Sequence, residues 1–240
     1  MKRKKAVVLL SGGLDSSTCL YWAFNKRYKC YALIFDYGQR HIKEIKQAKK
    51  LALKLKVDFK LVKLNLPWLK TSSLVDKSKK LPDIKLAKIT NAEIPSTYVP
   101  ARNLMMLSVA SSWADAMRAD VVIMGANVLD YSGYPDCRPS FINAFQKTVN
   151  EGTKSKKLKI LTPLLKLTKS QIIKLAVKLN VPLDLTWSCY KGGRFPCGKC
   201  DSCKLRKKAF DELEIKDPIV SSCSPLSKGG FEEKIKNRRI

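Results

Sequence analysis

Apolar and polar residues follow two recurring patterns along the chain. Residues 6–10 form a continuous apolar run that stops at a Ser-Gly-Gly turn, which is typical of a β-strand buried on both faces. Residues 41–56 instead place Ile42, Ile45 and Leu51 at helical spacing against a lysine-rich outer face, which indicates an amphipathic helix. Strands and helices of these two kinds are therefore expected to follow one another.

The same patterns predict the remaining elements. Strands are expected at residues 31–36, 59–64, 120–125 and 158–161, and helices at residues 16–24, 102–116, 141–149 and 168–179. Thr168, with Gln171 three residues later, is a capping-box signal for the last of these helices. This alternation predicts an α/β fold with a doubly wound, mainly parallel five-stranded sheet flanked by helices.

Ligands of such sheets bind beyond the carboxyl ends of the strands, and three polar loops begin there. These loops cover residues 11–17, 36–41 and 126–138. A further irregular stretch, residues 65–97, has weak periodicity and three prolines, so we expect a functional or mobile loop. The binding site is therefore expected at this edge of the sheet.

The composition fits one globular core with a small appendage. The chain has 240 residues, of which 45% are apolar, and no apolar run is long enough to span a bilayer. No signal-peptide pattern follows the basic N-terminus, so we expect a cytoplasmic protein without a membrane partner. The net charge of +27 suits a polyanion such as nucleic acid, but the lysines are spread along the whole chain, which favours a solvated surface.

The loop after the first predicted strand has the residues of a phosphate site. It consists of Leu10 and the run Ser11-Gly12-Gly13-Leu14-Asp15-Ser16-Ser17. Two glycines allow a tight turn that brings backbone N–H groups against a phosphate, and the following helix N-terminus adds partial positive charge. The run has neither the lysine of a GxxxxGK[ST] loop nor the spacing of GxGxxG. A plain turn with a capping side chain is the alternative, and the strand–turn–helix setting favours phosphate binding.

Eight cysteines in a chain without an export signal argue against a disulfide framework. Four of them, Cys189, Cys197, Cys200 and Cys203, fall within 15 residues, and four thiolates at this spacing suit a closed tetrahedral zinc site. An iron–sulfur cluster and a redox CxxC pair are the competing interpretations. A structural zinc is favoured, because it would hold a C-terminal segment that is poor in apolar residues. Cys19, Cys30, Cys137 and Cys223 are expected to be buried free thiols.

The loop after the second strand supplies the first candidate substrate-binding residues, which are Asp36, Tyr37, Gln39, Arg40 and His41. His41 is the only histidine; a catalytic base and a local helix cap are the two interpretations, and the cap is favoured.

Two further groups of candidates lie later in the chain. Arg102 and Asn103 open a helix, where Arg102 suits either a phosphate or carboxylate ligand or a local salt bridge. The loop before residue 139 contains Asp130, Tyr131, Tyr134, Asp136 and Arg138. Its tyrosines suit stacking on a flat heterocycle and its aspartates suit an amidine-like edge, and a turn with a local Asp–Arg pair is the alternative.

The run at residues 11–17 resembles the pyrophosphate loop of the N-type ATP pyrophosphatase superfamily, whose signature is Ser-Gly-Gly-x-Asp-Ser. That superfamily has the adenine nucleotide alpha hydrolase-like fold and includes amide-forming synthetases and tRNA thiolases. Its members generally activate an oxygen as an adenylate. The resemblance implies ATP as a substrate and Mg²⁺ on its phosphates, with Asp15 as a contact of that ion.

Five blocks in order resemble the 7-cyano-7-deazaguanine synthase family of the queuosine pathway, over residues 6–218. They are SGGLDSS, FDYGQRH with Glu44, STYVPARN, GANVLDYSGYPDCRP and SCY…CGKCDSCKLR. The resemblance implies a ligase that uses ATP and ammonia to convert 7-carboxy-7-deazaguanine through an amide to the nitrile. It also implies one structural Zn²⁺ per chain on the four clustered cysteines, and a homodimer that requires no nucleic acid.

The resemblance also implies a division of the chain and of the roles of its residues. Residues 1–185 would form the ATP-binding domain with its substrate loops, residues 186–218 a zinc segment packed on it, and residues 219–240 a basic tail. Asp15, Ser16 and Arg102 are expected to act in catalysis. Residues 10–17 are expected to bind the nucleotide, and the loop residues named above the substrate.

The chain departs from the family pattern at Ser96, Ser140 and Arg194. We expect Ser140 to alter the substrate loop and Arg194 to change local charge alone. An ATP-dependent tRNA thiolase of the same superfamily is the main alternative, since the net charge of +27 suits a polyanionic substrate. Against it, a thiolase needs a sulfur-carrying cysteine near ATP or a cluster, and no RNA-binding module is visible. A nucleic-acid-binding zinc knuckle on a scaffold is the third interpretation.

Overall fold

The computed structural model describes residues 3–40, 42–83, 94–127 and 133–221 of the chain. Within them lies one five-stranded sheet in the order β3-β2-β1-β4-β5, in which all neighbouring strands are parallel. The strands are β1 (Lys5–Leu9), β2 (Lys29–Asp36), β3 (Asp58–Lys63), β4 (Val121–Ile123) and β5 (Lys159–Leu161). The predicted doubly wound parallel sheet is therefore confirmed.

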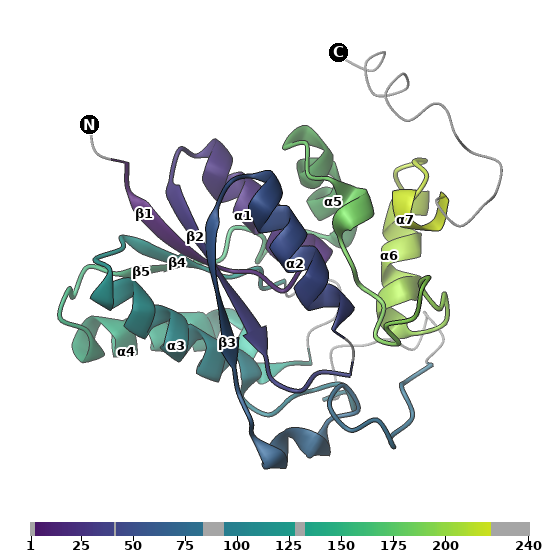
Figure 1. Ribbon diagram of the computed structural model, residues 1–240, viewed down its shortest axis with the longest axis horizontal. Coiled ribbons are helices and arrows are strands. Elements are labelled where there is room, and N and C mark those ends of the chain that lie inside the picture. Colours follow the sequence, from purple (N-terminus) through teal and green to yellow (C-terminus); the bar gives the residue numbers. More distant parts are fainter. Residues whose placement is uncertain (1–2, 41, 84–93, 128–132, 222–240) are drawn as a thin grey trace.

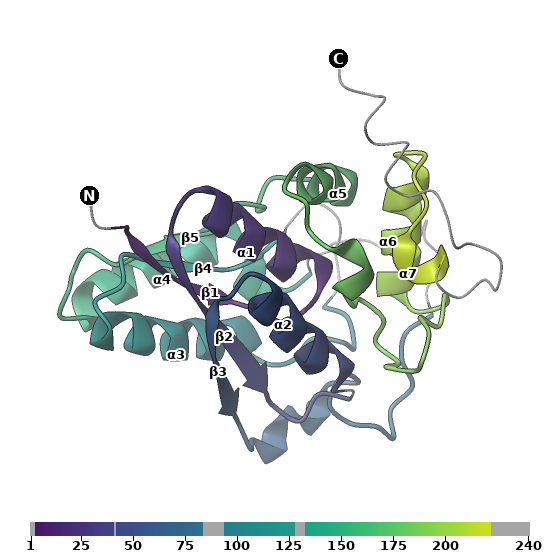
Figure 2. The same ribbon diagram turned by 45° about the horizontal axis from the view of Figure 1, so that its top comes forward.

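Helices cover both faces of the sheet, and the two groups stay on opposite sides of the strands in both views (Figure 1, Figure 2). One group consists of α1 (Leu14–Asn25), α2 (Lys43–Lys54) and α5 (Lys169–Lys178), with α6 (Asp201–Asp211) packed beside α5. The other consists of α3 (Arg102–Ala116) and α4 (Pro139–Gly152). Shorter elements are η1 (Pro67–Thr71), η3 (Pro135–Cys137), η4 (Leu183–Leu185) and α7 (Pro218–Ser221). None of the helices in the described part of the chain has the length and apolar character of a membrane span.

The apolar run of β1 explains why both faces are covered. Ala6 and Val8 belong to the hydrophobic core on the α1 side, and Val7 and Leu9 belong to the core on the α3 side. Alternate side chains of a strand point to opposite faces, so a continuous apolar run needs helices on both. β1 lies between β2 and β4, which brings the loops after these three strands to one edge of the sheet.

Two features at the C-terminal side refine the sequence predictions. The capping box is present, because Thr168 Oγ1 accepts a hydrogen bond from Gln171 N at 3.3 Å and Thr168 N donates to Gln171 Oε1 at 2.9 Å. No helix was expected after residue 186, so α6 is a correction. Phe210 of α6 is 1% exposed and belongs to the core on the α1 side. The segment therefore has an apolar anchor that the sequence reasoning overlooked.

Candidate active site

The loop between β1 and α1 is held by hydrogen bonds within its own residues. Ser11 N donates to Ser16 Oγ at 3.2 Å, the two hydroxyl oxygens lie 3.0 Å apart, and Ser17 Oγ donates to Gly13 O at 2.7 Å. No side chain caps α1 at its N-cap residue, Gly13. The start of α1, whose first residues Leu14, Asp15 and Ser16 line the pocket, therefore suits an anion.

Gly12 allows this loop to lie directly on α2. Its φ is 87°, a conformation that favours glycine, and a Cβ atom here would lie 2.3 Å from the backbone oxygen of Glu44. From the other side, Trp187 N donates to Gly12 O at 2.9 Å. The loop is thus fixed between α2 and the segment that leads to the clustered cysteines.

Asp15, the acidic residue of the loop, forms an ion pair with a residue distant in sequence. Lys169 Nζ lies 2.8 Å and 3.0 Å from the two carboxylate oxygens of Asp15. Both residues line the pocket. Lys169 is the first residue of α5, so the fold brings to the loop the lysine that the loop sequence lacks.

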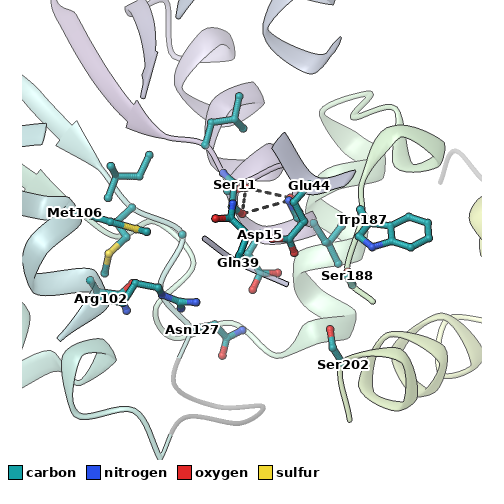
Figure 3. A pocket seen from close by; sticks show the side chains of 18 of the residues that line it. Ser11, Asp15, Gln39, Glu44, Arg102, Met106, Asn127, Trp187, Ser188 and Ser202 are labelled. Carbon is teal, nitrogen blue, oxygen red and sulfur yellow. Dashed lines mark hydrogen bonds between the residues drawn. The ribbon is translucent and has the colours of Figure 1, made fainter. Parts of the chain in front are cut away.

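The loop opens into a cavity of about 320 Å³ at the carboxyl ends of β1, β2 and β4. Figure 3 shows Ser11, Asp15, Gln39 and Glu44 in its middle, with Arg102 and Met106 on one side and Trp187 and Ser188 on the other. The sequence-predicted residues that line it are Leu10, Ser11, Gly13, Leu14, Asp15, Ser16, Tyr37, Gln39, Arg102, Asn103 and Tyr134. A pocket of this size at a strand-order switch point is a typical small-molecule site.

The loop after β2 is shaped by its own polar side chains. Gln39 Oε1 accepts from Tyr37 N at 2.9 Å, while Gln39 Nε2 donates to Phe35 O at 3.1 Å. Asp36 Oδ1 accepts from Gly38 N at 3.3 Å, away from the cavity lining. Arg40 Nη2 donates to the carbonyl oxygens of residues 77 and 79 at 2.5 Å and 2.8 Å, also outside it. Tyr37 and Gln39 therefore face the cavity, and Asp36 and Arg40 brace the loop.

Asp136 joins the later loop to the start of α3. Its Oδ2 accepts from Asn103 N at 2.8 Å, and its Oδ1 accepts from Asn103 Nδ2 at 3.3 Å. Asp136 is 6% exposed and does not line the cavity. The first turn of α3 is thus satisfied by a carboxylate of the protein, in contrast to the uncapped first turn of α1.

Arg102 interacts with Tyr37, from the loop after β2, and with Tyr134, from the loop before α4. Burial lowers the pKa of the Arg102 guanidinium, but the neighbouring Tyr37 and Tyr134 oxygens raise this pKa by more. The guanidinium therefore stays charged. Burial also raises the pKa of Tyr37 and of Tyr134 above 10, which keeps both phenols neutral. The Tyr134 hydroxyl lies 2.8 Å from Thr97 Oγ1. This end of the cavity offers a fixed cation and two aromatic rings, which suits a planar anion.

Three predicted site residues, His41, Asp130 and Tyr131, lie outside the described residues. Gly12, Ser17 and Arg138 belong to the described part and do not line the cavity. Sequence reasoning missed several lining residues, namely Lys169, Trp187, Tyr190, Ser202 and Arg206, and left Glu44 without a role. Lys169 follows a recognisable helix cap and Trp187 directly precedes the cysteine segment, but neither pattern by itself indicates a pocket.

Glu44 brings a second carboxylate to the cavity, from the first turn of α2. Burial raises the pKa of Glu44 from 4.5 to about 7, while Arg102 lowers it and Cys189 raises it. Folded chains therefore keep a proton on Glu44 at pH values where unfolded chains have released it. This group favours folding most at low pH, and its contribution is lost as the pH rises from about 4.5 through 7.

The variant Glu44→Gln, which cannot ionise, is expected to gain stability over the natural chain as the pH rises. The difference in free energy of unfolding should grow between pH 5 and pH 8 to about 1–3 kcal/mol, since one pKa unit corresponds to about 1.4 kcal/mol. Urea unfolding at several pH values measures it, and the exposed Glu151, changed to glutamine, serves as control. A difference that does not vary with pH would contradict the burial of this carboxylate.

The four clustered cysteines come together in the segment that follows Trp187. Their sulfur atoms all lie within 4.8 Å of one another. Cys189 Sγ accepts hydrogen bonds from Cys197 N at 3.3 Å and from Lys191 N at 3.4 Å, and Cys197 Sγ accepts from Cys200 N at 3.4 Å. Four converging sulfurs, with backbone N–H groups donating to those of Cys189 and Cys197, suit a metal ion bound by thiolates. Cys19, Cys30 and Cys137 are buried free cysteines, as predicted, and Cys223 lies outside the described residues.

Buried polar contacts connect this cluster to the cavity. Trp187 Nε1 donates to Cys189 O at 2.9 Å, and Lys43 Nζ lies 3.5 Å from the centre of the Trp187 ring. Arg206 Nε and Nη2 contact the two carboxylate oxygens of Asp217 at 2.6 Å and 3.0 Å, and Nη1 donates to Thr186 Oγ1 at 2.8 Å. The cysteine segment is therefore a wall of the cavity as well as a metal-type cluster.

Comparison with known proteins identifies the family. A family model described as "Queuosine biosynthesis protein QueC" matches residues 5–214. The chain belongs to the QueC family. The match includes every described residue that lines the cavity and all four clustered cysteines. The expected family membership is thus confirmed.

Curated relatives in the QueC family carry a consistent name. A "7-cyano-7-deazaguanine synthase" from Thermoplasma volcanium is 50% identical over 225 residues, which cover 92% of this chain and 92% of the relative. A protein of the same name from Acetivibrio thermocellus is 50% identical over 221 residues, covering 90% of this chain and 97% of the relative. Among solved structures, the U34-tRNA thiolase NcsA from Methanococcus maripaludis is 15% identical with a TM-score of 0.46, over 96% of this chain and 79% of that chain. That likeness is too low to bear on function.

Proposed function

We propose that this protein is an ATP-dependent ligase that forms carbon–nitrogen bonds. It converts 7-carboxy-7-deazaguanine and ammonia, through an amide, to 7-cyano-7-deazaguanine, a precursor of queuosine. The observation that carries the proposal is the cavity that Arg102 shares with the loop of residues 11–17, the proposed phosphate loop, in a chain that belongs to the QueC family. The names of relatives at about 50% identity support it.

The reaction proceeds in two activation steps. In the first, the substrate carboxylate attacks the α-phosphorus of ATP, which releases pyrophosphate and gives an acyl adenylate. Ammonia then displaces AMP and loses a proton, leaving the amide. In the second, the amide oxygen attacks the α-phosphorus of another ATP, which releases pyrophosphate and a proton and gives an adenylated imidate. Loss of AMP and a further proton from this imidate gives the nitrile. Both steps need charge neutralisation and alignment more than a strong acid or base.

The described residues divide these tasks between them. The N–H groups at the start of α1, with the Ser11 and Ser16 hydroxyls, bind the phosphates, and Arg102 pairs with the carboxylate of the substrate. Tyr37 and Tyr134 enclose the heterocycle on the same side. Asp15 is the carboxylate that Mg²⁺ would contact, and the ion would add positive charge to the phosphates. Cys189, Cys197, Cys200 and Cys203 would hold one structural Zn²⁺. The protein is proposed to act in the cytoplasm as a homodimer.

Incubation with ATP, ammonium and 7-carboxy-7-deazaguanine tests the proposal. Mass spectrometry should detect the nitrile, with the amide as an earlier product. Failure to form either product would refute it. Sulfur incorporation into tRNA without nitrile would instead favour the thiolase, for which Cys137 is the buried thiol among the described residues that line the cavity.

Within this assay, Arg102→Met is expected to lower kcat/KM for the acid by about 100–1,000-fold, since it removes the cation that pairs with the carboxylate. Arg118→Met, an exposed change just beyond the other end of α3, is the matched control and should retain full activity. ATP binding, measured separately, should change little in both variants. Equal activity of the two variants would contradict the role of Arg102.

A further inference from the structure

Three basic side chains line the cavity in the part of the chain that the structure describes: Arg102, Lys169 and Arg206. Arg206 is held by both carboxylate oxygens of Asp217. Arg102 interacts with tyrosines of the two substrate loops. Lys169 is the basic side chain that contacts the phosphate loop itself, through the carboxylate of Asp15.

The fold places Lys169 there with several independent contacts. The capping box at Thr168 fixes the first turn of α5, and Ile172 and Ile173 in the next turn are fully buried. Asn127, from the loop after β4, donates through Nδ2 to Leu167 O at 2.7 Å. The backbone around Lys169 is thus fixed, and its long side chain has freedom to move between neighbouring acceptors.

A ligand in the cavity can replace Asp15 as the partner of Lys169. The side chains of Lys169 and Asp15 are 20% and 24% exposed, so a ligand in the cavity can reach both. A partly solvated pair of this kind contributes little to stability, whereas a polyphosphate offers several charged oxygens to the same ammonium. A divalent cation bound by Asp15 would release the lysine toward the phosphates.

We propose that Lys169 binds the β- and γ-phosphates of ATP and stays on the pyrophosphate as it leaves. The ammonium forms no covalent bond; it neutralises negative charge that develops when the bond between the α-phosphorus and the bridging oxygen breaks. Asp15 holds Lys169 in the absence of nucleotide, and this explains how a loop without a lysine obtains one. The inference rests on the proposed function in one respect, the use of ATP.

Binding of inorganic pyrophosphate in the presence of EDTA tests the inference without any turnover. Isothermal titration is run on the full chain and on Asp15→Asn, Lys169→Met and the double variant. Asp15→Asn should bind pyrophosphate about 10-fold more tightly than the natural chain, because it frees Lys169 and removes a negative charge. Adding Lys169→Met to Asp15→Asn should weaken binding about 10–100-fold.

The comparison between Asp15→Asn and the double variant is decisive, because Asp15 is already neutral in both. Equal pyrophosphate affinity in these two proteins would show that Lys169 serves Asp15 alone, and would overturn the inference. Lys174→Met, an exposed change on the same helix, should leave affinity unchanged. Lys169→Arg, which keeps the charge, should stay within about 3-fold of the natural chain, and melting temperatures show that each variant is folded. Since no nitrile is measured, failure of the proposed function and failure of this inference are separate outcomes.

Discussion

Gly12→Ala is expected to abolish ATP binding and to destabilise the fold by about 3–5 kcal/mol. The new Cβ would lie 2.3 Å from Glu44 O and 2.7 Å from Ala48 N, which are backbone atoms of α2. Neither atom can move without displacing a helix whose residues Ala48 and Leu51 are fully buried. The phosphate loop or α2 must therefore shift. Nucleotide titration and urea unfolding measure the two effects.

Gly38→Ala is the matched control for this variant. Gly38 has a φ of 79°, close to the 87° of Gly12, but no atom beyond its two chain neighbours lies within 4 Å of a Cβ built there. Both variants place alanine in the left-handed region, which costs about 1–2 kcal/mol. Gly12→Ala adds the clash with the backbone of α2. Gly38→Ala should therefore lose about 1–2 kcal/mol of stability and keep its affinity for ATP. Equal losses of stability and ATP affinity in the two variants would show that the close contact of Gly12 with α2 does not cause the effect.

Removal of the zinc ion proposed for the four clustered cysteines is expected to have the second largest effect. The purified chain should contain one zinc ion, and chelation should lower the stability by several kcal/mol, since thiolate sites contribute strongly to folding. Cys189, Cys200 and Cys203 are at most 8% exposed. Without an ion, the sulfur atoms of the four cysteines would stay close together where little water reaches them. Metal analysis with thermal denaturation before and after chelation measures the effect.

ATP affinity should fall together with the metal. Cys189 lies two residues after Trp187, whose N–H holds Gly12 O at 2.9 Å, so the cluster and the phosphate loop share a short stretch of backbone. Cys200→Ser should reproduce both losses, while Cys30→Ser, a buried change outside the cluster, should keep the metal and the affinity. Iron with visible absorption in place of zinc would contradict the structural zinc and favour a cluster.

The sheet was predictable because each of its signals is local. Continuous apolar runs such as that of β1 need cover on two faces, and Thr168 with Gln171 marks the start of α5 within four residues. The phosphate loop was predictable for the same reason, since turn, glycines and helix start are adjacent in sequence. α6 escaped prediction because metal-ligand spacing occupies its first turn, and because its buried residues include the charged Asp201 and Arg206 as well as Phe210.

The cavity lining beyond the loop was less predictable because it depends on pairs of distant residues. Asp15 and Lys169 are 154 positions apart, and nothing in either local sequence indicates the other. Asp136 shows the opposite case. An aspartate is able to accept hydrogen bonds from a ligand, but Asn103 at the start of α3 already donates to both of its carboxylate oxygens. Residue type indicates what a side chain is able to bind, and the tertiary fold decides whether a protein group already occupies it.

The central position of β1 sets the order in which the site is completed during synthesis. β1 finds its first partner, β2, shortly after it emerges, whereas the contact of Lys5 N with Asp120 Oδ2 joins residues 115 positions apart. The side of β1 that pairs with β4 therefore stays unpaired until β4 has left the ribosome. Bringing the two strands together closes a loop of more than a hundred residues, which is slow. Trp187, which clamps Gly12, arrives later still. A nascent chain thus contains the residue 11–17 motif early and completes the loop's surroundings last, so we expect incomplete chains not to bind ATP.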